Sequence, residues 1–136
     1  MLRTMRSMSE MSVLDRLRFL TMKAEQTVNR TEHITDYHQF LVSPDAMDLF
    51  DATTLRVQVV GEMLKQIDDM TGGKLLRPFY PEIPWRSVFG MRNFISHEYS
   101  VVDPEKIFYT VKDDFPELIK VLHRIITDYE ANKVVL

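Results

Sequence analysis

The stretch between Ser43-Pro44 and Gly72-Gly73 constrains the fold more than any other part of the sequence. Serine followed by proline is a common helix start, because the serine side chain caps free amides and proline fits the first helical turn. A glycine pair is typical of a helix end. The sequence therefore predicts one helix of about 40 Å, longer than a small bundle can cover, with its overhang as a candidate interface. Its expected core face recurs at helical spacing: Ala46, Leu49, Phe50, Thr53, Val57, Val60, Leu64 and Ile67.

A shorter helix is expected before this one. Ser12 with Asp15 three residues later resembles a capping box in which aspartate replaces glutamate. Apolar residues follow at helical spacing, which predicts a first helix from about residue 9 or 12 to about Arg30. Whether it continues as far as Tyr37 is left open.

The second half of the chain predicts at least two more helices. Residues 74–84 hold three of the six prolines, which indicates a fixed, extended loop. A third helix is expected from Trp85 to about Tyr99. Asp103-Pro104 then starts a fourth, which Pro116 either kinks or divides into two nearly collinear helices. No strand pair or repeat is evident, so the predicted fold is all-α, an antiparallel bundle of four or five helices.

Composition narrows the class of protein. The 136 residues are 45% apolar and 27% charged, which fits one globular domain, expected at 9–136 after a flexible Met-rich extension at 1–8. Without cysteine there is no disulfide scaffold, thiolate nucleophile or Cys-containing zinc site. No apolar run is long enough to span a bilayer and no signal-peptide pattern is present, so no membrane partner is expected and the cytoplasm is the default location.

Charge is distributed unevenly along the chain. The total is 17 Lys+Arg against 20 Asp+Glu, a net charge of -3. One stretch, residues 74–97, holds four cations and a single acid: Lys74, Arg77, Arg86 and Arg92 against Glu82. Its local net of +3 leaves -6 for the remainder. A basic patch on an acidic body favours phosphate groups, and the first three cations are candidate RNA contacts. Ordinary surface chemistry explains the same count, so charge alone leaves both interpretations open.

The segment GMRNFISHEY at residues 90–99 carries the sharpest chemical signal. On an α-helix each residue turns about 100°, which places the apolar side chains of this segment on one half. The other half is polar and contains Arg92, Asn93, Ser96, His97 and Tyr99. A helix with one packed half and one polar half is suited to facing a cleft.

These side chains suit cleavage of a phosphodiester without a metal. His97 can take or give a proton near neutral pH, and Arg92 can hold a phosphate and stabilise transition-state charge. Asn93 and Tyr99 can orient the phosphate or stack on a base, and Ser96 can assist in orientation. In RNA the 2′-hydroxyl is an internal nucleophile. Because one His and one Arg are few for two proton transfers, a symmetric dimer would complete the site.

A structural interpretation of the same residues stays open. In it, His97 buttresses a helix end, Arg92 pairs with an acid and Tyr99 is half-buried. Glu62 is a further candidate, because a carboxylate in a mostly apolar helix face needs a partner such as Arg92 or Arg86. A solvent-facing Glu62 is the alternative.

The remaining candidates favour structural roles. Asp45, Asp48 and Asp51 complement the positive end of the long helix's dipole better than they suit a metal. His33, His38 and His123 have poor ligand spacing or surface positions. No HExxH, phosphate-loop or GxSxG motif occurs, so no metal and no cofactor is expected.

The segment at 90–99 resembles the signature of the HepT-like proteins of the HEPN superfamily. That signature is Arg, four residues, His, one residue and Tyr, here Arg92, His97 and Tyr99 with Asn93 directly after the arginine. Three flanking stretches resemble the family as well: Gly61-Glu62, YPEIPW at 80–85 and VDPEKIFYTVKDDFPEL at 102–118. The resemblance covers roughly residues 10–130.

The resemblance implies an all-α toxin of a toxin–antitoxin pair. It implies a homodimeric, metal-independent endoribonuclease that cleaves tRNA or mRNA, with Arg92 and His97 as catalytic residues. It further implies an MntA-type nucleotidyltransferase antitoxin that silences the toxin by transferring AMP to Tyr99. A bulky anion two residues from His97 would block the cleft and repel RNA phosphates. The rival interpretation is a non-catalytic helical subunit that docks on a minimal nucleotidyltransferase.

Overall fold

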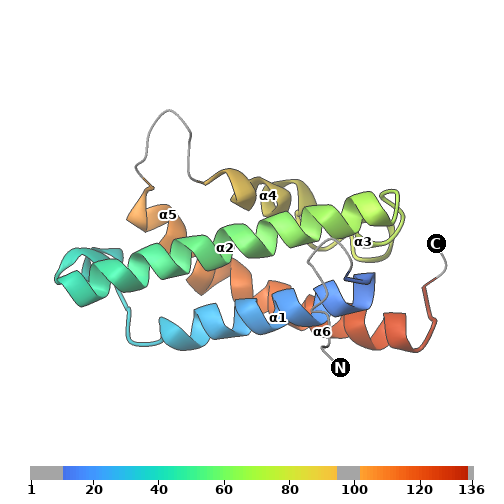
Figure 1. Ribbon diagram of the computed structural model, residues 1–136, viewed down its shortest axis with the longest axis horizontal. Helices are drawn as coiled ribbons and strands as arrows, with labels where there is room; N and C mark the ends of the chain where they lie inside the picture. The colour runs from blue at the N-terminus through green and yellow to red at the C-terminus, as the bar shows by residue number, and fades with distance from the viewer. Residues whose placement is uncertain (1–10, 95–101, 135–136) are drawn as a thin grey trace, which may run out of the picture.

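The computed structural model describes residues 11–94 and 102–134, and every regular element among these residues is helical (Figure 1). The expected all-α bundle is therefore confirmed. Helices α1, α2 and α6 run side by side, each antiparallel to the next in the order α2, α1, α6 (Figure 1). The flexible extension expected at 1–8 lies outside the described residues.

Helix α1 spans Val13–Arg30 and begins as its cap predicts. The Ser12 hydroxyl accepts a hydrogen bond from the Asp15 amide at 3.1 Å, which satisfies one free donor of the first turn. The helix does not continue toward Tyr37. A separate 3₁₀ helix, η2 (Tyr37–Leu41), begins there, and Asp36 caps it.

Helix α2 spans Pro44–Met70, and both of its predicted boundaries are confirmed. The Ser43 hydroxyl accepts from the Ala46 amide at 3.1 Å, with proline at the start of the helix. At the other end Gly72 and Gly73 have φ values of 61° and 71°, a left-handed conformation that side chains disfavour. Its 27 residues make α2 about 40 Å long, the longest described helix.

The loop expected at 74–84 contains a helical turn, so the expectation of an extended loop was wrong at residues 76–79. Helix α3 is the turn Leu76–Phe79, and Leu75, Leu76 and Tyr80 are buried. Burial of these apolar side chains favours the compact turn over an extended strand, although Pro78 lies within it. Helix α4 follows at Trp85–Gly90 and continues as the 3₁₀ turn η3 (Met91–Asn93).

The last helical segment is continuous but changes its pitch. Helix α5 (Pro104–Tyr109) starts at Asp103, whose carboxylate accepts from the Glu105 amide at 2.9 Å. A π-helical turn, η4 (Thr110–Asp114), leads into α6 (Phe115–Glu130). Pro116 lacks an amide donor and crowds the carbonyl four residues earlier, and the wide turn accommodates this defect. Of the two alternatives left open at Pro116, the structure has one helix with a local distortion.

The core lies where α1, α2 and α6 meet. Each contributes side chains with no exposed surface, and the loop at 75–80 adds more; these are Leu17, Leu20, Ala24, Val57, Val60, Leu64, Ile67, Leu75, Leu76, Leu122 and Ile125. A smaller cluster of Ile34, Phe40 and Phe108 holds η2 against α2 and α5. The core therefore fixes α2 as the support on which α4 and η3 rest.

Two hydrogen bonds connect Tyr80 to distant segments. Tyr80 is buried, its hydroxyl donates to Asp128 Oδ2 of α6 at 2.9 Å, and its carbonyl accepts from Trp85 Nε1 at 2.8 Å. Burial first, and then the Asp128 hydrogen bond, raise the pKa of the Tyr80 phenol. These bonds join the start of α4 to α6 and so fix the direction in which the motif segment leaves the core.

We expect Tyr80→Phe to lower the free energy of unfolding by about 1–2 kcal/mol at neutral pH, because Asp128 loses its donor. The raised pKa means that the folded state keeps the phenol protonated. This stabilisation is therefore complete below the ordinary tyrosine pKa of about 10 and is lost as pH rises above it. Urea unfolding at neutral and alkaline pH measures both effects. Exposed Tyr109→Phe is the control, and an equal effect of the two variants would contradict the assignment.

Candidate functional site

The described part of the motif is residues 90–94, at the end of α4. The α-helix expected to reach Tyr99 ends at Gly90, and Met91–Asn93 form a 3₁₀ turn. Residues in a 3₁₀ turn advance by about 120°, so the α-helical spacing used above does not apply to this turn. Ser96, His97 and Tyr99 lie outside the described residues. The described part of the candidate site is therefore Arg92 and its surroundings.

Helix α2 approaches the motif most closely at Gly61. A Cβ atom placed on Gly61 would lie 2.9 Å from the Arg92 amide nitrogen, 2.9 Å from the Met91 Cβ and 3.0 Å from the Val88 carbonyl oxygen. Such distances are too short for any side chain, so only glycine allows α2 and η3 to pack backbone against backbone. Met91 is buried beside this contact. Gly61 thus fixes the position of the Arg92 backbone.

A hydrogen bond one turn earlier in α2 completes the attachment. Gln58 Nε2 donates to the Arg92 carbonyl oxygen at 3.3 Å. The Arg92 side chain itself is exposed and has no ion pair with the described residues. A fixed backbone with an unpaired guanidinium is well suited to bind an anion from solvent.

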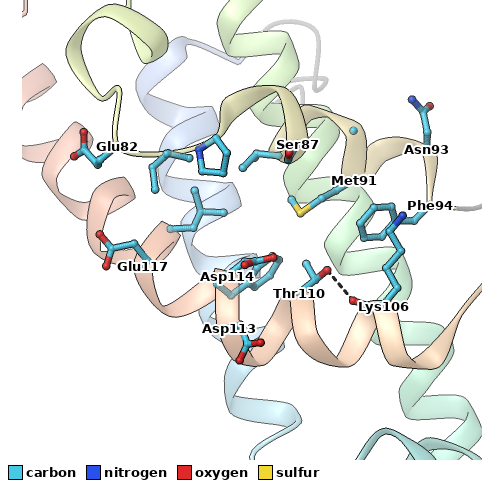
Figure 2. Close-up of a pocket in the computed structure, with 16 residues that line it drawn as sticks. Glu82, Ser87, Met91, Asn93, Phe94, Lys106, Thr110, Asp113, Asp114 and Glu117 are labelled. Atoms are coloured by element: carbon cyan, nitrogen blue, oxygen red, sulfur yellow. Dashed lines mark hydrogen bonds between the residues drawn. The ribbon is translucent and has the colours of Figure 1, made fainter.

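Two neighbours of Arg92 extend the motif toward α5. Asn93 is exposed, and Phe94 is half-buried with the Lys106 Nζ 4.6 Å from its ring centroid. This cation–π contact ties the end of the motif to α5. Figure 2 shows Phe94 and Lys106 lying together, while Asn93 points away from them.

The candidate RNA contacts occupy different places. Arg86 is exposed on α4, the helix that leads into η3. Lys74 and Arg77 lie beyond the end of α2, and Gly61 is ten residues, or about 15 Å, before Thr71 along that helix. Arg77 donates to Asp68 Oδ2 at 3.3 Å and stacks over Phe89, so its charge is partly neutralised within the protein. Arg86 and Arg92 lie on the consecutive elements α4 and η3, and Arg77 reaches α4 through its contact with Phe89.

Glu62 faces solvent. It accepts a hydrogen bond from Gln66 Nε2 at 3.3 Å and forms no ion pair with Arg92 or Arg86. Of the two possibilities raised from the sequence, the structure has the exposed carboxylate. Glu62 follows Gly61 directly in α2, so it still contributes a negative charge near the Arg92 turn.

Among the residues that the structure describes, no three His, Asp or Glu side chains are grouped so that they would hold a metal ion. The same residues include no helix with the length and apolar character needed to cross a membrane.

Gly61 and Gln58 are the residues whose positioning role sequence reasoning missed. A glycine in the middle of a long helix costs about 1 kcal/mol relative to alanine, and such a cost often marks a close approach of another backbone. That signal was available, since Gly61 interrupts an otherwise regular helical face. The hydrogen bond of Gln58 spans 34 residues, and no local pattern predicts it.

The chain matches a known protein family over most of its length. The model of the ribonuclease HepT-like family matches residues 22–125. The chain is 36% identical over 75 residues to a Methanocaldococcus jannaschii protein provisionally named an RNase, covering 55% of this chain and 58% of that protein. It is 36% identical over 62 residues to a Thermococcus cleftensis protein provisionally named ribonuclease HepT, covering 46% and 52%.

A longer match has lower identity. A Caldanaerobacter subterraneus protein, also provisionally named an RNase, is 26% identical over 110 residues, which cover 81% of this chain and 90% of the relative. The chain thus spans little more than half the length of the M. jannaschii and Thermococcus relatives. No solved structure matches the chain.

We expect Gly61→Ala to lower the free energy of unfolding by about 1 kcal/mol. Overpacking costs roughly 1–3 kcal/mol, and the gain in helix propensity offsets up to about 1 kcal/mol of that cost. Gly90→Ala is the matched control, because a Cβ at Gly90 meets nothing within 4 Å. Urea unfolding followed by circular dichroism should show the Gly90 variant unchanged or slightly more stable. Identical midpoints for the two variants would disprove the close approach at Gly61.

Proposed function

The chain belongs to the ribonuclease HepT-like family, and from this premise we propose that it is a metal-independent endoribonuclease, the toxin of a toxin–antitoxin pair. Its substrate is a cellular RNA, either tRNA or mRNA, met in the cytoplasm. The proposed catalytic residues are Arg92 and His97, with Asn93 and Ser96 orienting the phosphate. Family membership and the resemblance of residues 90–99 support this assignment.

One observation carries the proposal: Arg92 is an exposed cation on a fixed backbone. Gly61 and Gln58 hold its amide and carbonyl, so the flexible side chain extends from a defined backbone position. Its two parallel donors match the oxygens of a phosphate. Arg86, on the preceding helix, adds a second exposed cation for the RNA backbone.

In the proposed reaction, RNA supplies its own nucleophile. The 2′-oxygen forms a bond to phosphorus while the bond from phosphorus to the 5′-oxygen breaks, leaving a 2′,3′-cyclic phosphate. One imidazole takes the proton of the 2′-hydroxyl, and a protonated imidazole gives one to the leaving 5′-oxygen. Arg92 stabilises the additional negative charge on the phosphate oxygens during the transfer. Two His97 residues, one from each copy of the chain, provide both proton steps.

The outward face of α2 is the proposed dimer interface. Leu55 is 61% exposed there, one turn before Gln58, the residue that binds the Arg92 carbonyl. Covering this exposed leucine with a second copy of the chain would bury apolar surface and favour association. Packing two α2 helices along this face would bring two Arg92 turns near one another, which is what the two-proton reaction requires.

Silencing is proposed to act at Tyr99. A nucleotidyltransferase antitoxin of the MntA type would transfer AMP to its hydroxyl, placing a bulky phosphate two residues from His97. The added negative charge would occupy the space of an RNA phosphate and repel the substrate. Family resemblance supports this regulatory step.

We expect Arg92→Ala to reduce the rate of RNA cleavage by about 10²–10³-fold, because it removes the transition-state charge stabilisation. His97→Ala should reduce it by about 10²–10⁴-fold through loss of proton transfer. Cleavage of labelled RNA in EDTA, with intact mass recorded on the same sample, measures both. Arg18→Ala is the control, since Arg18 is an exposed arginine on α1 that pairs with Glu130.

The outcomes of this assay separate the candidate functions. Cleavage by the wild type and the Arg18 variant, but not by the Arg92 or His97 variant, would support the proposed ribonuclease. No cleavage by a protein of unmodified mass would favour the non-catalytic docking subunit instead. No cleavage with one AMP mass added would identify the silenced form, and the assay would then be repeated after removal of the AMP.

We expect Leu55→Asp to convert a dimer into a folded monomer and to abolish cleavage with it. A buried leucine contributes roughly 1.5–3 kcal/mol, and a buried aspartate adds a desolvation cost. The dissociation constant of the dimer should therefore rise at least about tenfold. Light scattering after size exclusion measures the molecular mass. Met22→Asp on α1, a similarly exposed apolar residue, should leave the dimer intact. If the Leu55 variant stays dimeric, the dimer interface does not lie on this face of α2.

A further inference from the structure

A pocket of about 730 Å³ lies beside the motif, between the α4–η3 segment and the η4–α6 segment (Figure 2). Its floor is apolar and comes from both sides: Ile83, Val88, Met91, Phe94, Phe115 and Leu118. The floor residues Phe115 and Leu118 also belong to the core, so the pocket is formed on rigid elements. Its size is that of typical binding pockets, and its apolar floor can take large apolar side chains.

The rim of this pocket is acidic. Four carboxylates and one cation line it: Glu82, Asp113, Asp114 and Glu117 against Lys106. Figure 2 shows Glu82 and Glu117 at one end, the two aspartates along the middle, and Lys106 with Phe94 at the other end. Lys106 is occupied by its contact with the Phe94 ring, and Glu82 is paired with Arg124.

The two aspartates are displayed by the π-helical turn. Asp113 and Asp114 are its last two residues, and the turn exists because Pro116 follows. Partial desolvation first, and then the charge of Asp113, raise the pKa of Asp114, which is still an exposed residue. π-turns of this kind are frequent at functional sites. A cation entering the pocket would relieve the repulsion between the two carboxylates.

The charge of the rim selects against RNA. Each phosphate entering the pocket would meet several carboxylates at close range, and like charges near a protein surface repel one another. Arg92 and Arg86 are absent from the pocket lining, so no exposed arginine of the motif compensates there. A ligand with positive charge and an apolar side chain satisfies both the rim and the floor.

We propose that this pocket is the docking groove for a basic, amphipathic segment of a protein partner, whose large apolar side chain fills the floor while flanking Arg or Lys residues pair with Asp113, Asp114 and Glu117. Charge complementarity and the apolar floor carry this assignment. Met91 and Asn93 line the groove and are the immediate neighbours of Arg92, so an occupant contacts the turn that holds the proposed catalytic arginine. Only this regulatory consequence rests on the proposed function.

The test uses a defined probe, a fluorescein-labelled peptide in which arginine and leucine alternate. Fluorescence anisotropy at physiological salt compares the wild type with the double variant Asp114→Asn/Glu117→Gln, which removes two rim charges at nearly constant shape. The matched control is Asp45→Asn/Asp48→Asn, two exposed carboxylates on α2 outside the groove. We expect the groove variant to weaken binding at least about tenfold and the control variant to leave it within about twofold. A comparison peptide with glutamate in place of arginine should not bind the wild type.

A second measurement shows whether the peptide binds at the floor of the pocket. Methyl NMR of the wild type should show shifts at Ile83, Val88 and Leu118 on adding the peptide, with residues of α1 unchanged. The same peptide should slow RNA cleavage by the wild type but not by the groove variant. Binding is measured without RNA, so failure of the ribonuclease assay leaves the docking result intact.

Two results would overturn the proposal. Equal weakening by the groove and control variants would show diffuse attraction to an acidic protein. Unchanged peptide binding by the groove variant, together with an altered base preference in RNA cleavage, would identify the pocket as a nucleobase site instead.

Discussion

The backbone contact at Gly61 is the constraint on which the motif's geometry depends. Helix α2 is long, and its core side chains around Gly61, which are Val57, Val60 and Leu64, are fully buried, so it cannot move aside to admit a side chain at that point. The Arg92 amide therefore lies where the missing Cβ leaves space, and Gln58 fixes the adjacent carbonyl. A flexible cation thereby gains a rigid base, which is the usual requirement for stabilising charge in a transition state.

Local interactions account for the parts of the fold that the sequence predicts well. Ser12, Ser43 and Asp103 cap helices through their own side chains a few residues away, and Gly72 ends α2 by adopting a positive φ. Each of these effects depends on neighbouring residues only, so the pattern is visible before any tertiary structure is known. The family resemblance at Arg92 similarly depends on a short stretch of sequence.

Tertiary contacts decided the features that sequence analysis missed. The turn at Leu76 forms because apolar side chains of the loop reach the core, and Tyr80 is held by Asp128, which is 48 residues away. The α-helix expected to reach Tyr99 gives way at Gly90 to a 3₁₀ turn packed on α2. Neither composition nor helical spacing predicts contacts between residues so far apart in the sequence. The acidic pocket likewise joins residues 82–94 with 106–118.

Charge divides the surroundings of the motif into a basic and an acidic surface. Arg92 and Arg86 are exposed cations without an acid partner among the described residues, whereas the pocket lined by neighbouring Asn93 carries an excess of carboxylates. Polyanions and basic segments are therefore attracted to different sides of the same short turn. Because Met91 contacts both Gly61 and the pocket, a ligand on the acidic side acts on the backbone that positions the basic side. This shared turn would give the proposed protein partner a direct physical route to the proposed RNA site without competing for the phosphate position.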